Sequence, residues 1–160
     1  MGVLAWRRIP VVAPIAGLGS ISEPCGFAHT HAEKEDCAGD AKMCHVLVIE
    51  DDWLIAEHIS HLLESAGATS ITVAATEADA IAAAHATLPG LITSDVQLAE
   101  GSGPSAVQTI IGTLGPIPVI FVTGTPEACQ PCDPGMVILG KPVDDRALTM
   151  TFRRMAPFAG

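Results

Sequence analysis

Three acidic residues directly follow an apolar run near the middle of this sequence. The run "VLVI" (46–49) leads into Glu50, Asp51 and Asp52. Two carboxylates about 4 Å apart repel each other by roughly 4 kcal/mol at an effective dielectric constant near 20. A divalent cation would remove this repulsion, and ligands that are all oxygen favour Mg²⁺ or Mn²⁺. The acidic cluster therefore predicts a metal site.

Three further polar side chains end apolar runs later in the chain. Asp95 ends "LITSD", Thr123 ends "VIFVT" and Lys141 follows "MVILG". A phosphoryl group on Asp95 would be held by the metal ion, by the Lys141 ammonium and by the Thr123 hydroxyl. The metal ion would also neutralise charge during phosphoryl transfer. The chemistry that these residue types predict is metal-dependent phosphoryl transfer to Asp95.

Hydrophobic patterning from Met43 onward predicts strands that alternate with helices. A continuous apolar run such as "HVLVI" is typical of a parallel strand that is covered on both faces. The predicted strands are 45–50, 69–76, 91–96, 117–124 and 136–142, and the predicted helices are 51–67, 77–88, 104–115 and 143–156. This alternation predicts an α/β fold with a doubly wound, five-stranded parallel sheet. Sites in such sheets form outside the carboxyl ends of the strands, where the polar residues stand.

Composition excludes several classes of partner. The chain has 160 residues, enough for one domain with a core. Only eight Lys and Arg residues stand against 18 acidic ones, and a net charge of −10 argues against a nucleic-acid partner. No apolar run is long enough to span a membrane. Five cysteines, an odd number, favour a reducing compartment, so we expect a cytoplasmic protein.

The first 42 residues differ from the rest of the chain. They contain Pro10, Pro14 and Pro24 and have no sustained helical or strand period. We expect residues 1–42 to be a disordered or weakly structured extension and residues 43–160 to form the folded domain. A second interpretation is that Met43 is the natural first residue.

Four motifs together resemble the receiver domains of two-component response regulators. They are "VLVIEDD", "LITSDV", "VIFVTG" and "LGKP", in the order of that family and at the predicted strand ends. The resemblance covers residues 44–156. It implies a flavodoxin-like (βα)5 fold, a sandwich of three layers. It also implies a phosphorelay protein that takes a phosphoryl group from a sensor histidine kinase or a histidine phosphotransferase, with Mg²⁺.

The resemblance assigns a role to each residue of the metal site. Glu50 and Asp51 match the acidic pair that holds Mg²⁺, and Asp52 is then the residue after the pair. Asp95 matches the phosphoacceptor, which is also a metal ligand. Gln97 matches the position whose backbone carbonyl completes the metal shell. Whether Asp52 also touches the metal is left open.

The remaining matches concern the phosphoryl group. Thr123 matches the switch hydroxyl of the family, and Lys141 matches the lysine that precedes a proline. Gly124 matches the small residue that leaves room for the phosphoryl group, and Gly103 matches the glycine in the loop after the acceptor.

The sequence departs from the family between Thr123 and Lys141. This segment is shorter than in most receivers, and it holds three prolines, Pro126, Pro131 and Pro134. Prolines at this density break a regular helix, so we expect the fourth helix to be short, irregular or missing. Ile138 stands where many receivers have a Tyr or Phe that moves on activation. The segment is similar to that of a subgroup of stand-alone receivers, some of which are tied to general stress signalling.

The leading hypothesis is a receiver-only signalling protein rather than an enzyme, because few residues follow the last predicted helix. It would act by binding an unknown downstream protein or as a phosphate sink. One alternative is a Mg²⁺-dependent phosphohydrolase that forms an aspartyl phosphate. Those enzymes need a second Asp two residues after the nucleophile, where this chain has Gln97. Another alternative is a pseudo-receiver that binds a partner without phosphorylation.

Overall fold

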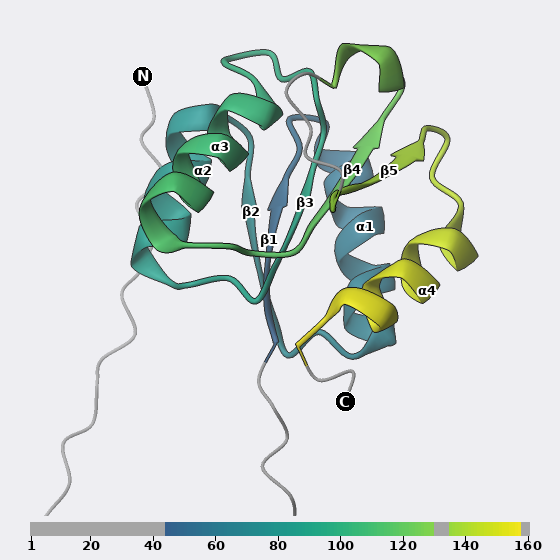
Figure 1. Cartoon of the computed structure of the whole chain (residues 1–160). Helices are drawn as coiled ribbons and strands as arrows, with labels where there is room; N and C mark the ends of the chain where they lie inside the picture. The colour runs from purple at the N-terminus through teal and green to yellow at the C-terminus, as the bar shows by residue number, and fades with distance from the viewer. Residues whose placement is uncertain (1–43, 130–134, 158–160) are drawn as a thin grey trace, which may run out of the picture. The chain divides into compact units, whose positions relative to one another are not determined.

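A parallel sheet with helices packed on both of its faces forms the described part of the chain (Figure 1). The computed structural model describes residues 44–129 and 135–157. The five strands lie in the order β2-β1-β3-β4-β5. They are β1 (His45–Ile49), β2 (Ser70–Ala74), β3 (Leu91–Ser94), β4 (Val119–Thr123) and β5 (Val137–Gly140). The helices are α1 (Trp53–Ala66), α2 (Glu77–Ala86), α3 (Gly103–Leu114), α4 (Asp145–Met155) and the short 3-10 helix η1 (Pro126–Ala128).

This architecture confirms the predicted doubly wound, flavodoxin-like sheet. All five strands are parallel to their neighbours. The element ends differ from the predicted ones by a few residues. Helix α1 begins at Trp53 rather than at residue 51, because the Asp52 side chain accepts the backbone N–H groups of Leu54 and Ile55 and caps the helix.

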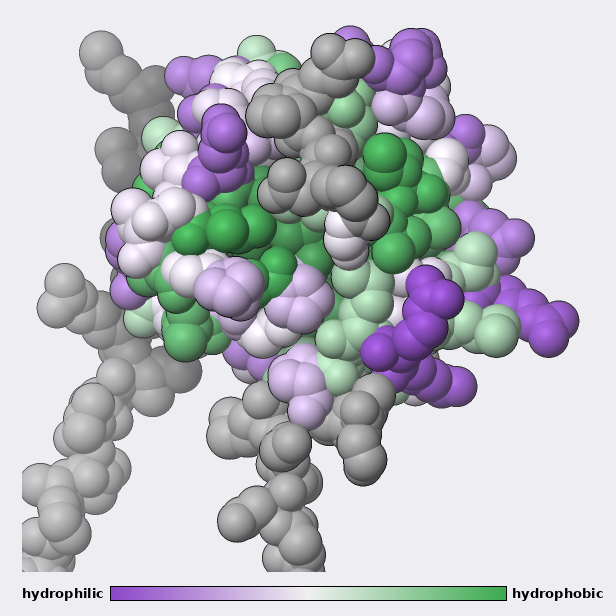
Figure 2. All heavy atoms as spheres, viewed as in Figure 1, coloured by the Kyte–Doolittle hydropathy of each residue, from purple (hydrophilic) through white to green (hydrophobic). Residues whose placement is uncertain are grey.

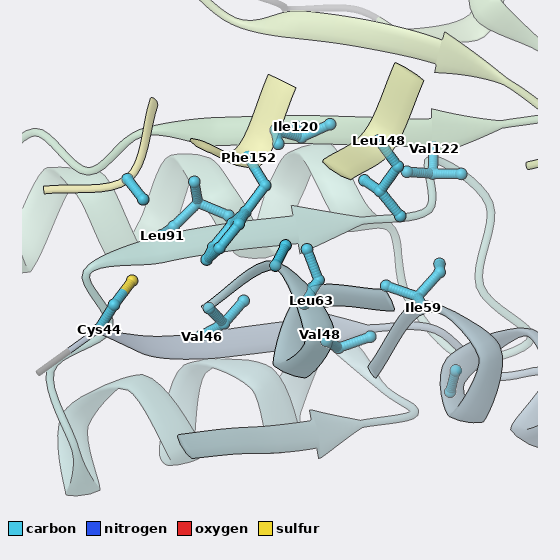
Figure 3. Close-up of a cluster of buried hydrophobic side chains, with 13 residues drawn as sticks. Cys44, Val46, Val48, Ile59, Leu63, Leu91, Ile120, Val122, Leu148 and Phe152 are labelled. Carbon is cyan, nitrogen blue, oxygen red and sulfur yellow. The ribbon is translucent and has the colours of Figure 1, made fainter. Parts of the chain in front are cut away.

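The apolar run of β1 is explained by cores on both sides of the sheet. Val46 and Val48 point to one core, which the side chains of α1 and α4 complete (Figure 3). Leu47 and Ile49 point to the other core, which α2 and α3 complete. Successive side chains of a strand point to opposite faces, so a central strand buried on both faces must be apolar throughout. The outer surface is mixed, and hydrophilic side chains lie around the hydrophobic ones on the face in Figure 2.

The segment between β4 and β5 departs from a full βα repeat. Among its described residues the only helical turn is η1, which has three residues and begins at Pro126. The expectation of a short or irregular fourth helix is therefore confirmed for the described residues. Pro131 and Pro134 lie outside them.

Residues 1–43 also lie outside the described part of the chain. The proposed extension over residues 1–42, and with it the domain boundary at residue 43, stays a prediction. None of the described helices is long and apolar enough to cross a membrane.

Candidate functional site

The sheet brings the acidic residues and the lysine together at one edge. The residue before Glu50 pairs with the residue before Asp95, and the residue before Lys141 pairs with Thr123. All four positions thus lie at the carboxyl ends of the strands. Glu50, Asp51 and Asp95 each place one carboxylate oxygen within 4.8 Å of the others. These three carboxylates could hold a metal ion, and their assignment as metal ligands stays a prediction.

Lys141 lies between two of these carboxylates. Its Nζ donates to Asp95 Oδ2 at 2.6 Å and to Glu50 Oε1 at 3.0 Å. The Glu50 residue is only 2% exposed. The cluster therefore has three carboxylates and one ammonium group, which contacts two of them, and it keeps an excess of negative charge that a divalent cation would balance.

The ionisation of Glu50 and Lys141 reflects this balance. Burial raises the pKa of Glu50, and the Asp95 charge adds to the rise, although the Lys141 hydrogen bond and charge oppose it. Burial alone would lower the pKa of Lys141, but hydrogen bonds and charges from Asp95 and Glu50 outweigh it and raise that pKa. Lys141 is thus protonated and positively charged, whereas burial makes the ionised form of Glu50 less favourable. The buried Oε2 of Glu50 lies 2.9 Å from Lys141 Nζ but accepts no hydrogen bond.

The Asp95 carboxylate is held at both oxygens. Oδ1 accepts the backbone N–H of Val96 at 2.6 Å and that of Gln97 at 3.3 Å. Oδ2 accepts from Lys141, as described above. The residue is 8% exposed, so it is oriented by the protein and still reaches the surface.

Asp51 and Asp52 have different tasks. Asp51 Oδ2 accepts the backbone N–H of Ala99 at 2.9 Å, which ties β1 to the loop after β3. Asp52 Oδ1 instead accepts the N–H of Leu54 at 2.9 Å as the cap of α1. The acidic cluster in the described residues includes Asp51 and does not include Asp52. The structure thus favours capping for the residue whose role the sequence left open.

The loop after β3, residues 95–102, carries Gln97. The backbone of Gln97 forms an antiparallel bridge with Ser102. The next residue, Gly103, approaches Asp95 closely, since a Cβ at Gly103 would lie 1.7 Å from the Asp95 carbonyl oxygen. Only glycine fits there. The Gln97 carbonyl as a metal ligand stays a prediction.

The Thr123 hydroxyl faces its own loop. Its Oγ1 accepts the backbone N–H of Thr125 at 3.1 Å and lies 3.3 Å from Thr125 Oγ1. Thr123 is buried at the end of β4. Sequence reasoning identified Thr123 and missed Thr125, although a second threonine two residues later is a common hydrogen-bonding turn pattern.

A match to a family model identifies the family of this chain. The model of the response regulator receiver domain matches residues 46–153. The chain belongs to this receiver family.

Relatives of this receiver include proteins named PhyR. The phyllosphere-induced regulator PhyR of Methylorubrum extorquens is 44% identical over 84 residues, which are 51% of this chain and 31% of that protein. The chain thus spans about a third of that relative's length. The PhyR receiver domain of Erythrobacter litoralis is 32% identical with a TM-score of 0.63, over 71% of this chain and 89% of that one. A mutant of the anti-anti-sigma factor PhyR of Bartonella quintana is 32% identical with a TM-score of 0.61, over 71% and 48%.

Proposed function

We propose that this receiver accepts a phosphoryl group on Asp95 in a Mg²⁺-dependent step of a two-component phosphorelay. The observation that carries the proposal is the convergence of Glu50, Asp51, Asp95 and Lys141 at one sheet edge. Membership of the receiver family supports it. The acidic residues and the lysine are the groups that such a transfer needs, and they come from three different strand ends.

The donor set fits Mg²⁺. Carboxylates of Glu50, Asp51 and Asp95 would hold the ion, and the carbonyl of Gln97 would complete the set. Two observations support the fit: the cluster has more carboxylates than ammonium groups, and the buried Glu50 Oε2 accepts no hydrogen bond. Mg²⁺ supplies charge neutralisation for the transferred group when it is bound.

The chain's own residues then have separate tasks in the transfer. A carboxylate oxygen of Asp95 attacks the phosphorus of a phosphohistidine. The O–P bond forms as the N–P bond breaks, and the imidazole leaves with the electron pair. Lys141 places its charge against the phosphoryl oxygens, and the Thr123 hydroxyl donates to one of them.

The proposed partners follow from this reaction. A sensor histidine kinase or a histidine phosphotransferase would supply the phosphoryl group in the cytoplasm. The output would be binding of a downstream protein, or removal of phosphate from the relay. Similarity to a protein described as an anti-anti-sigma factor supports a downstream partner in sigma-factor control. The rival phosphohydrolase is disfavoured because Gln97 stands where a general acid is needed.

Labelling with a small phosphodonor tests the proposal. Wild-type protein in acetyl phosphate and Mg²⁺ should gain one phosphoryl group, and EDTA should prevent this. Asp95→Asn should gain none, because an amide oxygen is a poor nucleophile. Glu50→Gln and Asp51→Asn should need more Mg²⁺ for the same rate. Asp79→Asn, an exposed acid on α2, is the matched control and should behave as wild type.

Two outcomes would contradict the proposal. Full labelling of Asp95→Asn would show that another residue accepts the group. A wild-type protein that neither acetyl phosphate nor a phosphorylated kinase can label would favour the pseudo-receiver.

A further inference from the structure

Glu77, the first residue of α2, holds the loop that follows β3. Its Oε2 accepts the backbone N–H of Ser102 at 3.0 Å, and its Oε1 accepts the hydroxyl of Ser105 at 2.5 Å. Its own backbone N–H donates to the Glu100 carbonyl at 3.3 Å. One residue of α2 thus makes three hydrogen bonds to the end of the loop and the start of α3. Helices α2 and α3 lie side by side on one face of the sheet (Figure 1).

The contact between Glu77 and the loop is close as well as polar. Gly101 has a φ of +85°, a backbone conformation that favours glycine. A Cβ at Gly101 would lie 2.4 Å from the Cβ of Glu77. The glycine therefore lets the loop approach α2 closely enough for the Glu77 carboxylate to reach Ser102.

Ser102 connects Glu77 to the acceptor. The Ser102 backbone pairs with Gln97, and the Gln97 N–H donates to Asp95 Oδ1. Gly103, next to Ser102, donates its N–H to the Val96 carbonyl at 3.2 Å. A short chain of backbone contacts therefore leads from the Glu77 carboxylate to the Asp95 carboxylate.

The loop has a second anchor at Asp51, just after the neighbouring strand β1. Asp51 Oδ2 accepts the N–H of Ala99, three residues before Ser102. If Asp51 also serves a metal ion, part of its hydrogen-bonding capacity is diverted from the loop. Glu77 lies outside the acidic cluster of the described residues, so a metal ion held by that cluster would not compete with the loop for the Glu77 carboxylate.

We propose that Glu77 is a positioning residue for the metal site. It fixes the loop after β3, so that Gln97 and Asp95 meet Glu50 and Asp51 in a geometry ready for Mg²⁺. The inference about the metal rests on the proposed function, whereas the inference about the loop rests on the contacts alone. Residues that orient metal ligands typically change metal affinity by about 10- to 100-fold when they are replaced.

Two measurements on the full chain test this role. The first is amide hydrogen exchange in metal-free protein, where Glu77→Ala should speed exchange in residues 97–105. The second is a Mg²⁺ titration followed by the amide chemical shifts of Gln97 and Gly103. Glu77→Ala should raise the Mg²⁺ dissociation constant by about 10-fold, at the low end of the usual range.

Three further variants separate positioning from general damage to the fold. Glu77→Gln keeps an oxygen that accepts the Ser102 N–H, so it should recover most of the Mg²⁺ affinity. Ser105→Ala removes only the hydroxyl contact, so it should have an intermediate effect. Asp79→Ala removes an acid from the same turn of α2 and should leave the Mg²⁺ affinity unchanged. It is the matched control, because Asp79 is exposed and its backbone N–H, which Thr76 accepts, is unaffected by the change of side chain.

The outcomes distinguish the two proposals. Equal Mg²⁺ affinities for Glu77→Ala and Asp79→Ala, with unchanged exchange in the loop, would overturn the positioning role. Faster loop exchange in Glu77→Ala, with a wild-type protein that binds no Mg²⁺, would support the anchor and overturn the metal-dependent function. Failure of Glu77→Gln to recover any affinity would show that the charge, and not the hydrogen bond, is what matters, and would also overturn the role as stated.

Discussion

Lys141 Nζ lies 2.6 Å from Oδ2 of Asp95 and 2.9 Å from Oε2 of Glu50, so one ammonium group joins the ends of three strands. The Lys141 side chain is 18% exposed and that of Glu50 is 1% exposed. Removing one member of a buried ion pair is destabilising because it leaves the other charge uncompensated. The lysine therefore contributes to the stability of the metal-free receiver as well as to the proposed chemistry.

Lys141→Met should lower the free energy of unfolding in EDTA by about 2 kcal/mol. Breaking a buried ion pair costs roughly 3–5 kcal/mol, and the partial exposure of Lys141 reduces this. Urea unfolding measures the change, and added Mg²⁺ should restore part of it by supplying a cation to Glu50 and Asp95. Arg154→Met, on the exposed last turn of α4, is the control and should change stability by less than about 0.5 kcal/mol. If Lys141→Met is as stable as wild type, the fold does not need the Lys141 charge to offset the repulsion among the carboxylates.

Gly103→Ala and Gly112→Ala should have opposite effects although both lie in α3. A Cβ at Gly103 would lie 1.7 Å from the Asp95 carbonyl oxygen, so the loop or the helix must move. We expect a loss of roughly 3 kcal/mol and weaker labelling of Asp95. A Cβ at Gly112 meets nothing within 4 Å, so alanine should stabilise this helix by about 0.5–1 kcal/mol. A Gly103→Ala protein with wild-type stability and labelling would contradict the close approach.

Much of this site could be predicted from the sequence because Glu50, Asp95, Thr123 and Lys141 each stand at the end of a predicted strand. The strand–helix alternation predicts that Glu50, Asp95 and Lys141 lie at one sheet edge, and the structure brings them together. The hydrophobic pattern alone did not distinguish Asp51 from Asp52. The family resemblance assigned the metal pair to Glu50 and Asp51, and the structure adds that Asp52 caps the first turn of α1.

Glu77 could not be found in the same way. It accepts from residues 25 and 28 positions later in the chain, and an Asp or Glu after a Thr cap is typical of any helix start. Such a pattern predicts the helix and carries no information on a partner loop. The partner is set by how α2 and α3 pack, which is a property of the tertiary structure.

The acid dependence of stability should report the Glu77 contacts. Hydrogen bonds from Ser105 and Ser102 hold the pKa of Glu77 below its usual value of 4.5 in the folded protein. A group whose pKa is lower when folded stabilises the fold above its unfolded pKa, and this contribution is lost as the pH falls through the folded pKa. The difference in free energy of unfolding between wild type and Glu77→Gln should thus have its largest value at pH 7. It should become smaller as the pH falls below about 4.5. Urea unfolding at pH values from 7 to 3 measures it, and a difference that is constant over this range would exclude the ionised carboxylate as its source.

The Thr123 hydroxyl predicts how a phosphoryl group would reach the loop after β4. A hydroxyl can donate one hydrogen bond and accept two, so Thr123 can donate to a phosphoryl group while it still accepts the Thr125 N–H. When Thr123 moves toward the phosphoryl group, residues 124–129 should move with it, because their only helix is the three-residue η1. Hydrogen bonds to charged groups contribute about 1.5–3 kcal/mol, enough to slow amide exchange about 10-fold or more. We expect this slowing in residues 124–129 when beryllofluoride and Mg²⁺ bind. Thr123→Ala should bind the mimic without slowing exchange there, and equal slowing in both proteins would place the switch elsewhere.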